Sequence, residues 1–86
     1  DQIIMMENPV RGTARFAVDL ERTGEVLISL YACDGRMVQT LEPGLSGPGR
    51  LHLSLDVSRL SSGFYFAELS VDGVTYGSAS LVLLGP

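Results

Sequence analysis

The chain has 86 residues, of which 45% are hydrophobic, and its formal net charge is −4. An acidic balance argues against binding to the phosphate backbone of nucleic acid, which requires a basic face. The six basic residues are all arginine, which excludes lysine chemistry such as a Schiff base or an isopeptide cross-link, and the single cysteine excludes an internal disulfide. The apolar content suffices for one small core, and no apolar run approaches the ~20 residues that span a bilayer.

Two strands are predicted at the start of the chain. Ile3–Met6 is a short apolar run that Asn8 and Pro9 end, because proline cannot donate a hydrogen bond to a sheet and keeps its predecessor extended. Thr13–Leu20 alternates apolar and polar residues, which indicates a strand with one buried and one exposed face. The predicted buried face consists of Ala14, Phe16, Val18 and Leu20.

A hairpin is predicted next, between strands at Glu25–Ala32 and Arg36–Leu41. A two-residue loop would place Leu30 opposite Gln39. A three-residue loop of Cys33, Asp34 and a left-handed Gly35 places Leu30 opposite Val38, so that apolar residues face each other, as strand register requires. We therefore expect a type I turn followed by a bulge at the glycine.

The middle of the chain predicts a loop and then a strand. Pro43–Gly49 holds three glycines and two prolines and is typical of a loop. Leu51–Val57 alternates, and Ser58–Ser62 is expected to be a connection of about one helical turn. The predicted inward residues of this strand are Leu51, Leu53, Leu55 and Val57.

The last two strands are predicted at Phe64–Val71 and Val74–Leu84, the first of them rich in aromatic residues. A two-residue type I′ turn at Asp72-Gly73 would pair their ends and place Leu69 opposite Tyr76. The total is about seven strands joined by hairpin-like links. This pattern predicts an all-β fold, an antiparallel immunoglobulin-like β-sandwich of about seven strands.

Residue types that carry chemistry are scarce and scattered. His52 is the only histidine and is predicted on an outward strand face, so it has no second histidine with which to bind a metal. Cys33 lies in a turn, where Arg36 could approach it but His52, the usual kind of partner for a nucleophilic cysteine, is not obviously near. Asp56 is the best candidate for a calcium ligand, but no Asp-rich loop accompanies it. We expect no catalytic, cofactor-binding or metal-binding residues and no enzyme activity.

Three tyrosines leave a second function open. Tyr31, Tyr65 and Tyr76 could form a carbohydrate-binding face, so a glycan-binding or other ligand-binding module is the alternative interpretation. Tyrosines in a small sandwich more often bury the ring and hydrogen-bond the hydroxyl at the rim of the core.

Four segments, in order, resemble a known family. They are ENPV at Glu7–Val10, the hairpin at Val26–Leu41, LDVSRLSSGFYFAEL at Leu55–Leu69 and SLVLL at Ser80–Leu84. Together they resemble the type A C-terminal sorting domain of type IX secretion cargo and, equally, the related immunoglobulin-like domain of flagellar hook-capping proteins. The matching positions are Asn8, Pro9, Tyr31, Gly35, Arg36, Val38, Leu60, Ser62, Gly63 and Tyr65.

Several matching positions have an expected structural role. Two other features of the sequence depart from the family pattern. Asn8-Pro9 is expected to stop the first strand and let the chain cross to the other sheet, and Gly63 to permit a tight entry into the aromatic strand. No basic residue follows Arg59, whereas sorting signals usually carry one near the terminus, and Glu7 replaces a usual proline. The ending Leu83-Leu84-Gly85-Pro86 therefore favours the hook-capping type.

The resemblance implies a non-catalytic accessory or sorting domain of a secreted or surface bacterial protein that passes through the periplasm. We expect residues 1–86 to be one domain at the C-terminal end of a longer exported chain. The implied partners are an upstream domain of the same polypeptide and the secretion machinery or a cell-surface component. No nucleic acid, membrane insertion or cofactor is expected.

Overall fold

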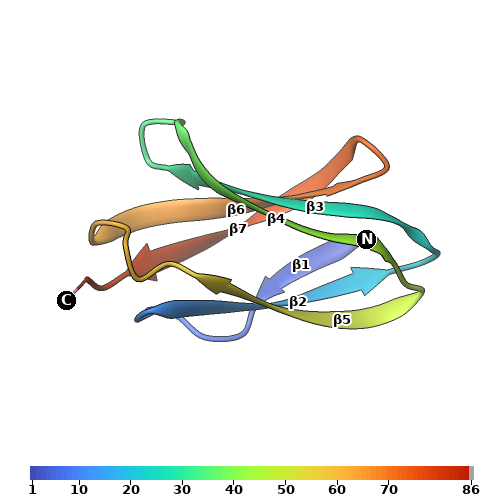
Figure 1. The fold of residues 1–86 in the computed structure, drawn as a ribbon, viewed down its shortest axis with the longest axis horizontal. Coiled ribbons are helices and arrows are strands. Elements are labelled where there is room, and N and C mark those ends of the chain that lie inside the picture. Colours follow the sequence, from blue (N-terminus) through green and yellow to red (C-terminus); the bar gives the residue numbers. More distant parts are fainter. Residues whose placement is uncertain (86) are drawn as a thin grey trace.

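The computed structural model describes residues 1–85, which form two packed antiparallel sheets (Figure 1). One sheet has the strand order β1-β2-β5 and the other β4-β3-β6-β7. This confirms the predicted immunoglobulin-like sandwich. The seven strands are β1 (Gln2–Met5), β2 (Thr13–Leu20), β3 (Gly24–Ala32), β4 (Met37–Ser46), β5 (Gly49–Asp56), β6 (Gly63–Val71) and β7 (Val74–Leu83). In the described residues, no helix is long and apolar enough to cross a membrane.

One hydrophobic core fills the space between the sheets. Alternate residues of β2, β3, β6 and β7 point into it, as the period of two in a strand requires. The inward face predicted for β2 is confirmed, since all four of its residues are buried. The largest fully buried side chains include Phe16, Ile28, Leu30, Leu69 and Leu81.

The predicted loop at 43–49 was wrong. β4 continues to Ser46, where Leu45 pairs with Glu25, and β5 begins at Gly49. Pro43 is tolerated within β4 for two reasons. The strand is at the edge of its sheet, and the pairing register shifts at this point, and edges and bulges are the places where a sheet accepts proline.

The β3–β4 hairpin confirms the predicted turn. Gly35 has a φ of 86°, its N–H donates to the carbonyl of Ala32 at 2.9 Å, and Ala32 N–H donates to the carbonyl of Arg36 at 2.9 Å. This is a three-residue loop with a left-handed glycine.

The register predicted beyond that turn was wrong. Leu30 lies opposite Gln39, because Val38 is an extra residue in a bulge between two paired positions. Val38 and Leu41 are three residues apart and would face opposite sides of a regular strand. The bulge allows both side chains to pack against the core.

In the β6–β7 hairpin, as in the β3–β4 hairpin, the predicted turn is confirmed and a bulge displaces the pairing beyond it. Val71 pairs with Val74 as predicted, and Asp72 and Gly73 have φ values of 51° and 80°, as a type I′ turn requires. The predicted pairing of Leu69 with Tyr76 was wrong, since Leu69 lies opposite Gly77. A second bulge turns Tyr76 out of the ladder and leaves it 45% exposed.

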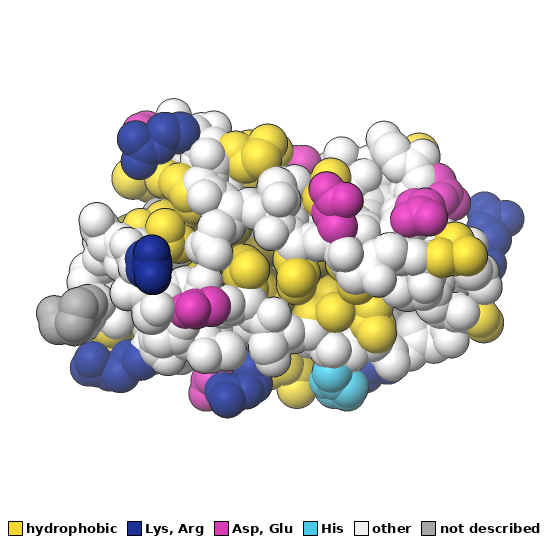
Figure 2. Space-filling model, in the orientation of Figure 1, with side chains coloured by type: hydrophobic (Ala, Val, Ile, Leu, Met, Phe, Trp, Pro, Cys, Tyr) yellow, Lys and Arg dark blue, Asp and Glu magenta, His cyan; other side chains and the backbone are white. Residues whose placement is uncertain are grey.

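The two flanks of the sandwich differ. On one flank Val10, in the link between β1 and β2, forms a bridge to Leu83 of β7 and so connects the two sheets. On the other flank β4 and β5 face each other, joined at one end by a hydrogen bond of 2.7 Å from Gln39 Nε2 to the Asp56 carbonyl. Figure 2 shows hydrophobic side chains along this β4/β5 flank. Half-buried residues that pack against the core here are Val38, Leu41, Leu51 and Leu53.

The left-handed turn gives a stability prediction. Gly35→Val should lower the free energy of unfolding by roughly 1–2 kcal/mol, because a β-branched residue is poorly tolerated at positive φ. Urea denaturation measures this change. Gly35→Asn is the matched control and should cost less, since asparagine adopts the left-handed conformation more readily. Unchanged stability of the valine variant would contradict the turn.

Candidate functional site: the motif end of the sandwich

The ten positions that carry the family resemblance lie in or beside three links at one end of the sandwich. The links are residues 6–12 between β1 and β2, 33–36 between β3 and β4, and 57–62 between β5 and β6. Residues 83–85 reach the same end, and Figure 1 shows the N-terminus at the opposite one. We call the three links together with residues 83–85 the motif end.

Residues 8–10 act as a short extra strand on the free edge of β7. Asn8 Oδ1 accepts a hydrogen bond from Val82 N–H at 2.8 Å, and Asn8 Nδ2 donates to the Ser80 carbonyl at 3.5 Å. Val10 N–H then donates to the Val82 carbonyl at 2.8 Å, and the Val10 carbonyl accepts from Leu84 N–H at 2.9 Å. A side-chain amide has the same donor and acceptor as a peptide group, so Asn8 substitutes for backbone. We call these contacts the β7 clamp.

The clamp explains the first family motif. After Asn8-Pro9 the chain leaves β1 of one sheet and pairs through Val10 with β7 of the other. This confirms the crossing that the sequence predicts.

The β5–β6 link is fixed by hydrogen bonds to the C-terminal residues and to β6. Ser62 Oγ accepts from Gly85 N–H at 2.6 Å, which ties the link to the C-terminal residues. The Tyr65 ring is buried, and its hydroxyl donates to the Ser61 carbonyl at 2.7 Å, as predicted for a tyrosine at the rim of the core. Leu60 N–H closes a single turn on the Val57 carbonyl at 3.1 Å. Gly63 enters β6 with a φ of 150°, which favours glycine.

The hairpin contributes the remaining motif positions. The Tyr31 ring stacks on Phe66 of β6, with centroids 5.1 Å apart and an interplanar angle of 18°. Arg36 is exposed, and its backbone N–H donates to Asp34 Oδ1 at 3.0 Å. Val38 packs against the core from the bulge of β4.

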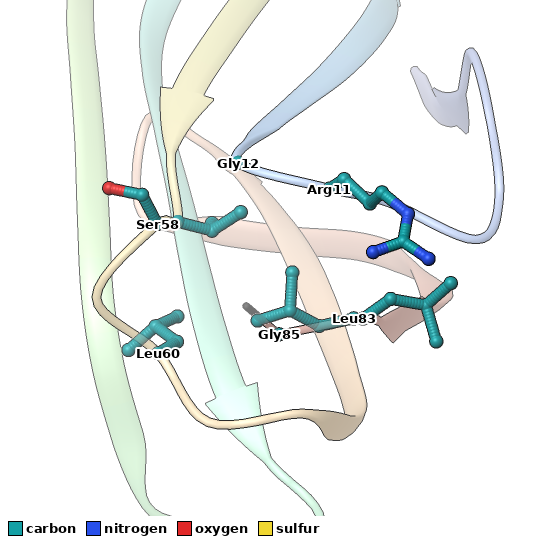
Figure 3. Close-up of a pocket in the computed structure, with 8 residues that line it drawn as sticks. Arg11, Gly12, Ser58, Leu60, Leu83 and Gly85 are labelled. Atoms are coloured by element: carbon teal, nitrogen blue, oxygen red, sulfur yellow. The ribbon is translucent and has the colours of Figure 1, made fainter.

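A small pocket of about 170 Å³ opens between two of the links and the C-terminal residues (Figure 3). Figure 3 shows Arg11 on one side and Ser58 and Leu60 on the other, with Gly85 between them. The walls are mostly aliphatic, and one guanidinium group stands beside them. The lining residues are Arg11, Gly12, Val57, Ser58, Leu60, Leu83, Leu84 and Gly85.

Three exposed arginines lie at the motif end, beside the acidic residues Glu7 and Asp34. Arg11, Arg36 and Arg59 are exposed and form no ion pair with any of residues 1–85, whereas Arg15 pairs with Glu7 at 2.8 Å and Arg50 with Asp19 at 2.7 Å. Figure 2 shows arginine side chains, in dark blue, spread over this end. Of these three arginines, only Arg36 is among the motif positions found in the sequence. The other two could have been found from their places in predicted links beside the motif residues.

The acidic residue that was considered for calcium has a structural role. Asp56 Oδ1 accepts from Ser58 N–H at 3.0 Å at the start of the β5–β6 link. Hydrogen bonds from the side chain and the backbone of Ser58 hold the pKa of Asp56 below the ordinary value of 3.8. In the described part of the chain, no group of three or more His, Cys, Asp or Glu side chains could hold a metal ion.

The other candidate residues are not brought together. His52 lies on β5 of one sheet, and Cys33 lies in the turn of a hairpin of the other. Tyr65 points into the core, Tyr31 stacks on the outer face of its sheet and Tyr76 lies near the opposite end. The three tyrosines therefore do not form one glycan-binding face.

The comparisons with known proteins agree with this arrangement. A family model described as "Secretion system C-terminal sorting domain" matches residues 8–81. The chain belongs to this family of sorting domains. The match begins at Asn8 of the clamp and includes all ten motif positions. No curated protein matches the chain.

A solved structure shows the same fold. The crystal structure of dimeric latent PorU from Porphyromonas gingivalis aligns with a TM-score of 0.83 at 19% identity. The alignment covers 98% of this chain but only 9% of the PorU chain, so the likeness concerns the fold of one domain. The hook-capping type, which the ending at 83–86 favoured, finds no support in these matches. Pro86 itself lies outside the described residues.

The clamp leads to a test of stability. Asn8→Ala should lower the free energy of unfolding by about 1–2 kcal/mol, because Val82 N–H loses its acceptor. Asn8→Asp retains that acceptor and serves as the matched control, with a smaller expected loss. Thermal and urea denaturation check both variants. A fully stable Asn8→Ala would show that the side chain is not needed to hold β7.

Asp56 leads to a pH test. Because its folded pKa is depressed, its ionised form stabilises the fold above about pH 4, and this contribution is lost as the pH falls through the folded pKa. Asp56→Asn cannot titrate, so the stability difference between wild type and variant should shrink from about pH 5 to about pH 2. Urea denaturation across this range measures the difference. A difference independent of pH would refute the role given to Ser58.

Proposed function

We propose that this domain is the sorting signal of an exported bacterial protein and that the type IX secretion machinery recognises its motif end. The observation that supports the proposal is convergence. Ten family positions, in or beside three links that are far apart in sequence, lie at one end of the sandwich together with the C-terminal residues. A shared sequence pattern that converges on one surface is expected when that surface is recognised.

The motif residues have two kinds of role in this proposal. Asn8, Ser62 and Tyr65 use their polar atoms to fix the links and the last strand. They hold the shape of the motif end in this chain. The exposed Arg36, together with Arg11 and Arg59, is then free to contact a partner, because it has no ion pair with a described residue.

The placement of the chain ends suits a cargo domain. A domain joined before Asp1 would lie at the end opposite to the motif end (Figure 1). The motif end would therefore project away from an upstream domain of the same polypeptide and stay accessible. We infer a non-catalytic domain of a secreted or cell-surface protein that passes through the periplasm.

A fusion experiment tests the proposal. A reporter with a signal peptide is joined to residues 1–86 and expressed in a host that has the type IX system. We expect the reporter at the cell surface or in the medium, and a reporter retained in the periplasm would contradict the sorting role.

A charge variant tests which end is recognised. Replacing Arg11, Arg36 and Arg59 together by alanine should lower export by about tenfold or more, the effect of losing ~1.4 kcal/mol of binding. Arg22→Ala is the control, because that exposed arginine lies beyond β2 at the other end. Equal export of both variants would argue against recognition through the motif end.

A further inference from the structure

Four strands lie at sheet edges, and three of them are protected against pairing with another chain. β1 has only four residues, and β4 carries two register shifts and Pro43. β7 has the bulge at Tyr76 and the β7 clamp over its C-terminal half. Short length, bulges, proline and a covering segment are the usual means by which proteins block an edge.

β5 is the exception. It pairs with β2 through eight consecutive residues without a register shift, and its sequence GRLHLSLD holds no proline or lysine. Val57 N–H bonds the Gly12 carbonyl on the β2 side, while the Asp56 carbonyl accepts from Gln39 on the other side. Since peptide groups alternate in direction along a strand, those of Arg50, His52 and Ser54 face the free side.

The side chains beside this edge are apolar. Leu51 and Leu53 point inward but are only half buried, because in the described part of the chain no strand pairs with β5 on its outer side. They belong to the β4/β5 flank that Figure 2 shows as a band of hydrophobic side chains. An added strand would therefore gain both hydrogen bonds and buried apolar area.

We propose that the free edge of β5 pairs antiparallel with β5 of a second copy of this chain, about a two-fold axis at Leu53. The strand sequence is complementary to itself in this register. Arg50 faces Asp56 of the second copy, Leu51 faces Leu55, and His52 faces Ser54. Apolar residues meet apolar residues. The charged residues at the strand ends meet opposite charges, in addition to the bonds that Arg50 makes to Asp19 and Asp56 to Ser58 within each copy.

Other registers are worse. A shift by one residue would place leucines opposite polar side chains, so that apolar residues of one copy would no longer meet apolar residues of the other on the inner face. A shift by two residues would leave an end of the strand unpaired and remove the match between Arg50 and Asp56. The resulting contact joins the two three-stranded sheets and closes on itself as a C2 dimer. The proposal does not depend on the sorting function.

A cysteine substitution tests the register. In a Cys33→Ser background, Leu53→Cys should form an intermolecular disulfide under mild oxidation, since the two copies of residue 53 face each other across the axis. His52→Cys in the same background is the single-cysteine control and should cross-link far less, because it faces residue 54. Equal cross-linking of the two variants, or none by Leu53→Cys, would overturn the proposal.

A proline substitution tests the edge. Sedimentation of the 86-residue chain over a range of concentrations should show a monomer–dimer equilibrium. Ser54→Pro removes an N–H that faces the free side and should raise the dissociation constant by at least about tenfold. Ser78→Pro places the same change on the β7 edge and should leave the equilibrium unchanged. A monomer at every concentration, or a dimer that survives Ser54→Pro but not Ser78→Pro, would contradict the assignment.

Discussion

The β7 clamp is the contact on which the architecture of this domain most depends. Among the strands of residues 1–85, only β6 pairs with β7 along its length. Without the clamp, β7 would present a free edge at the end where Leu81 and Leu83 complete the core. The four hydrogen bonds of Asn8 and Val10 give the C-terminal half of β7 a second neighbour. They also join the two sheets by main-chain and amide contacts. A single asparagine followed by proline thus ends one strand and secures another.

The remaining contacts of the motif end build outward from the clamp. With β7 in place, Gly85 N–H reaches the Ser62 hydroxyl, and Tyr65 anchors the same link from beneath. The pocket between the β1–β2 and β5–β6 links is a consequence of these ties, since its walls include Leu83 and Leu84. The arginines are then carried on links of defined shape. This order, from clamp to links to charges, relates the sandwich to the surface that we propose the secretion machinery recognises.

Most of the fold could be predicted from alternation and turn chemistry. β2 was predicted at its observed bounds, and the turns at Gly35 and at Asp72-Gly73 followed from the need for positive φ. The pairings beyond both turns failed for one reason, which is the bulge. Val38 and Leu41 are both apolar at a spacing of three, a pattern that no regular strand can bury. This spacing is the signal in the sequence for the bulge at Val38. Tyr76 offers no such signal, since only the pairing with β6 shows that it is displaced.

The candidate site was predictable in its members but not in its mechanism. The family pattern identified Asn8, Ser62 and Tyr65, yet nothing in one sequence indicates that an asparagine amide bonds a strand 74 residues away. The arginines of the motif end were equally hidden, because a net charge of −4 gives no sign that three arginines without ion pairs among the described residues lie at one end. Both features arise from long-range topology, which periodicity does not report.

Amide hydrogen exchange of the wild-type chain tests the account most directly. If the clamp secures the last strand, the amides of Val10, Val82 and Leu84 should exchange as slowly as those of the core strands. Ser78, on the same edge of β7 but before the first residue that the clamp contacts, should exchange quickly. Fast exchange at Val10, Val82 and Leu84, at the rate of Ser78, would show that the clamp does not form and would remove the basis for the motif end.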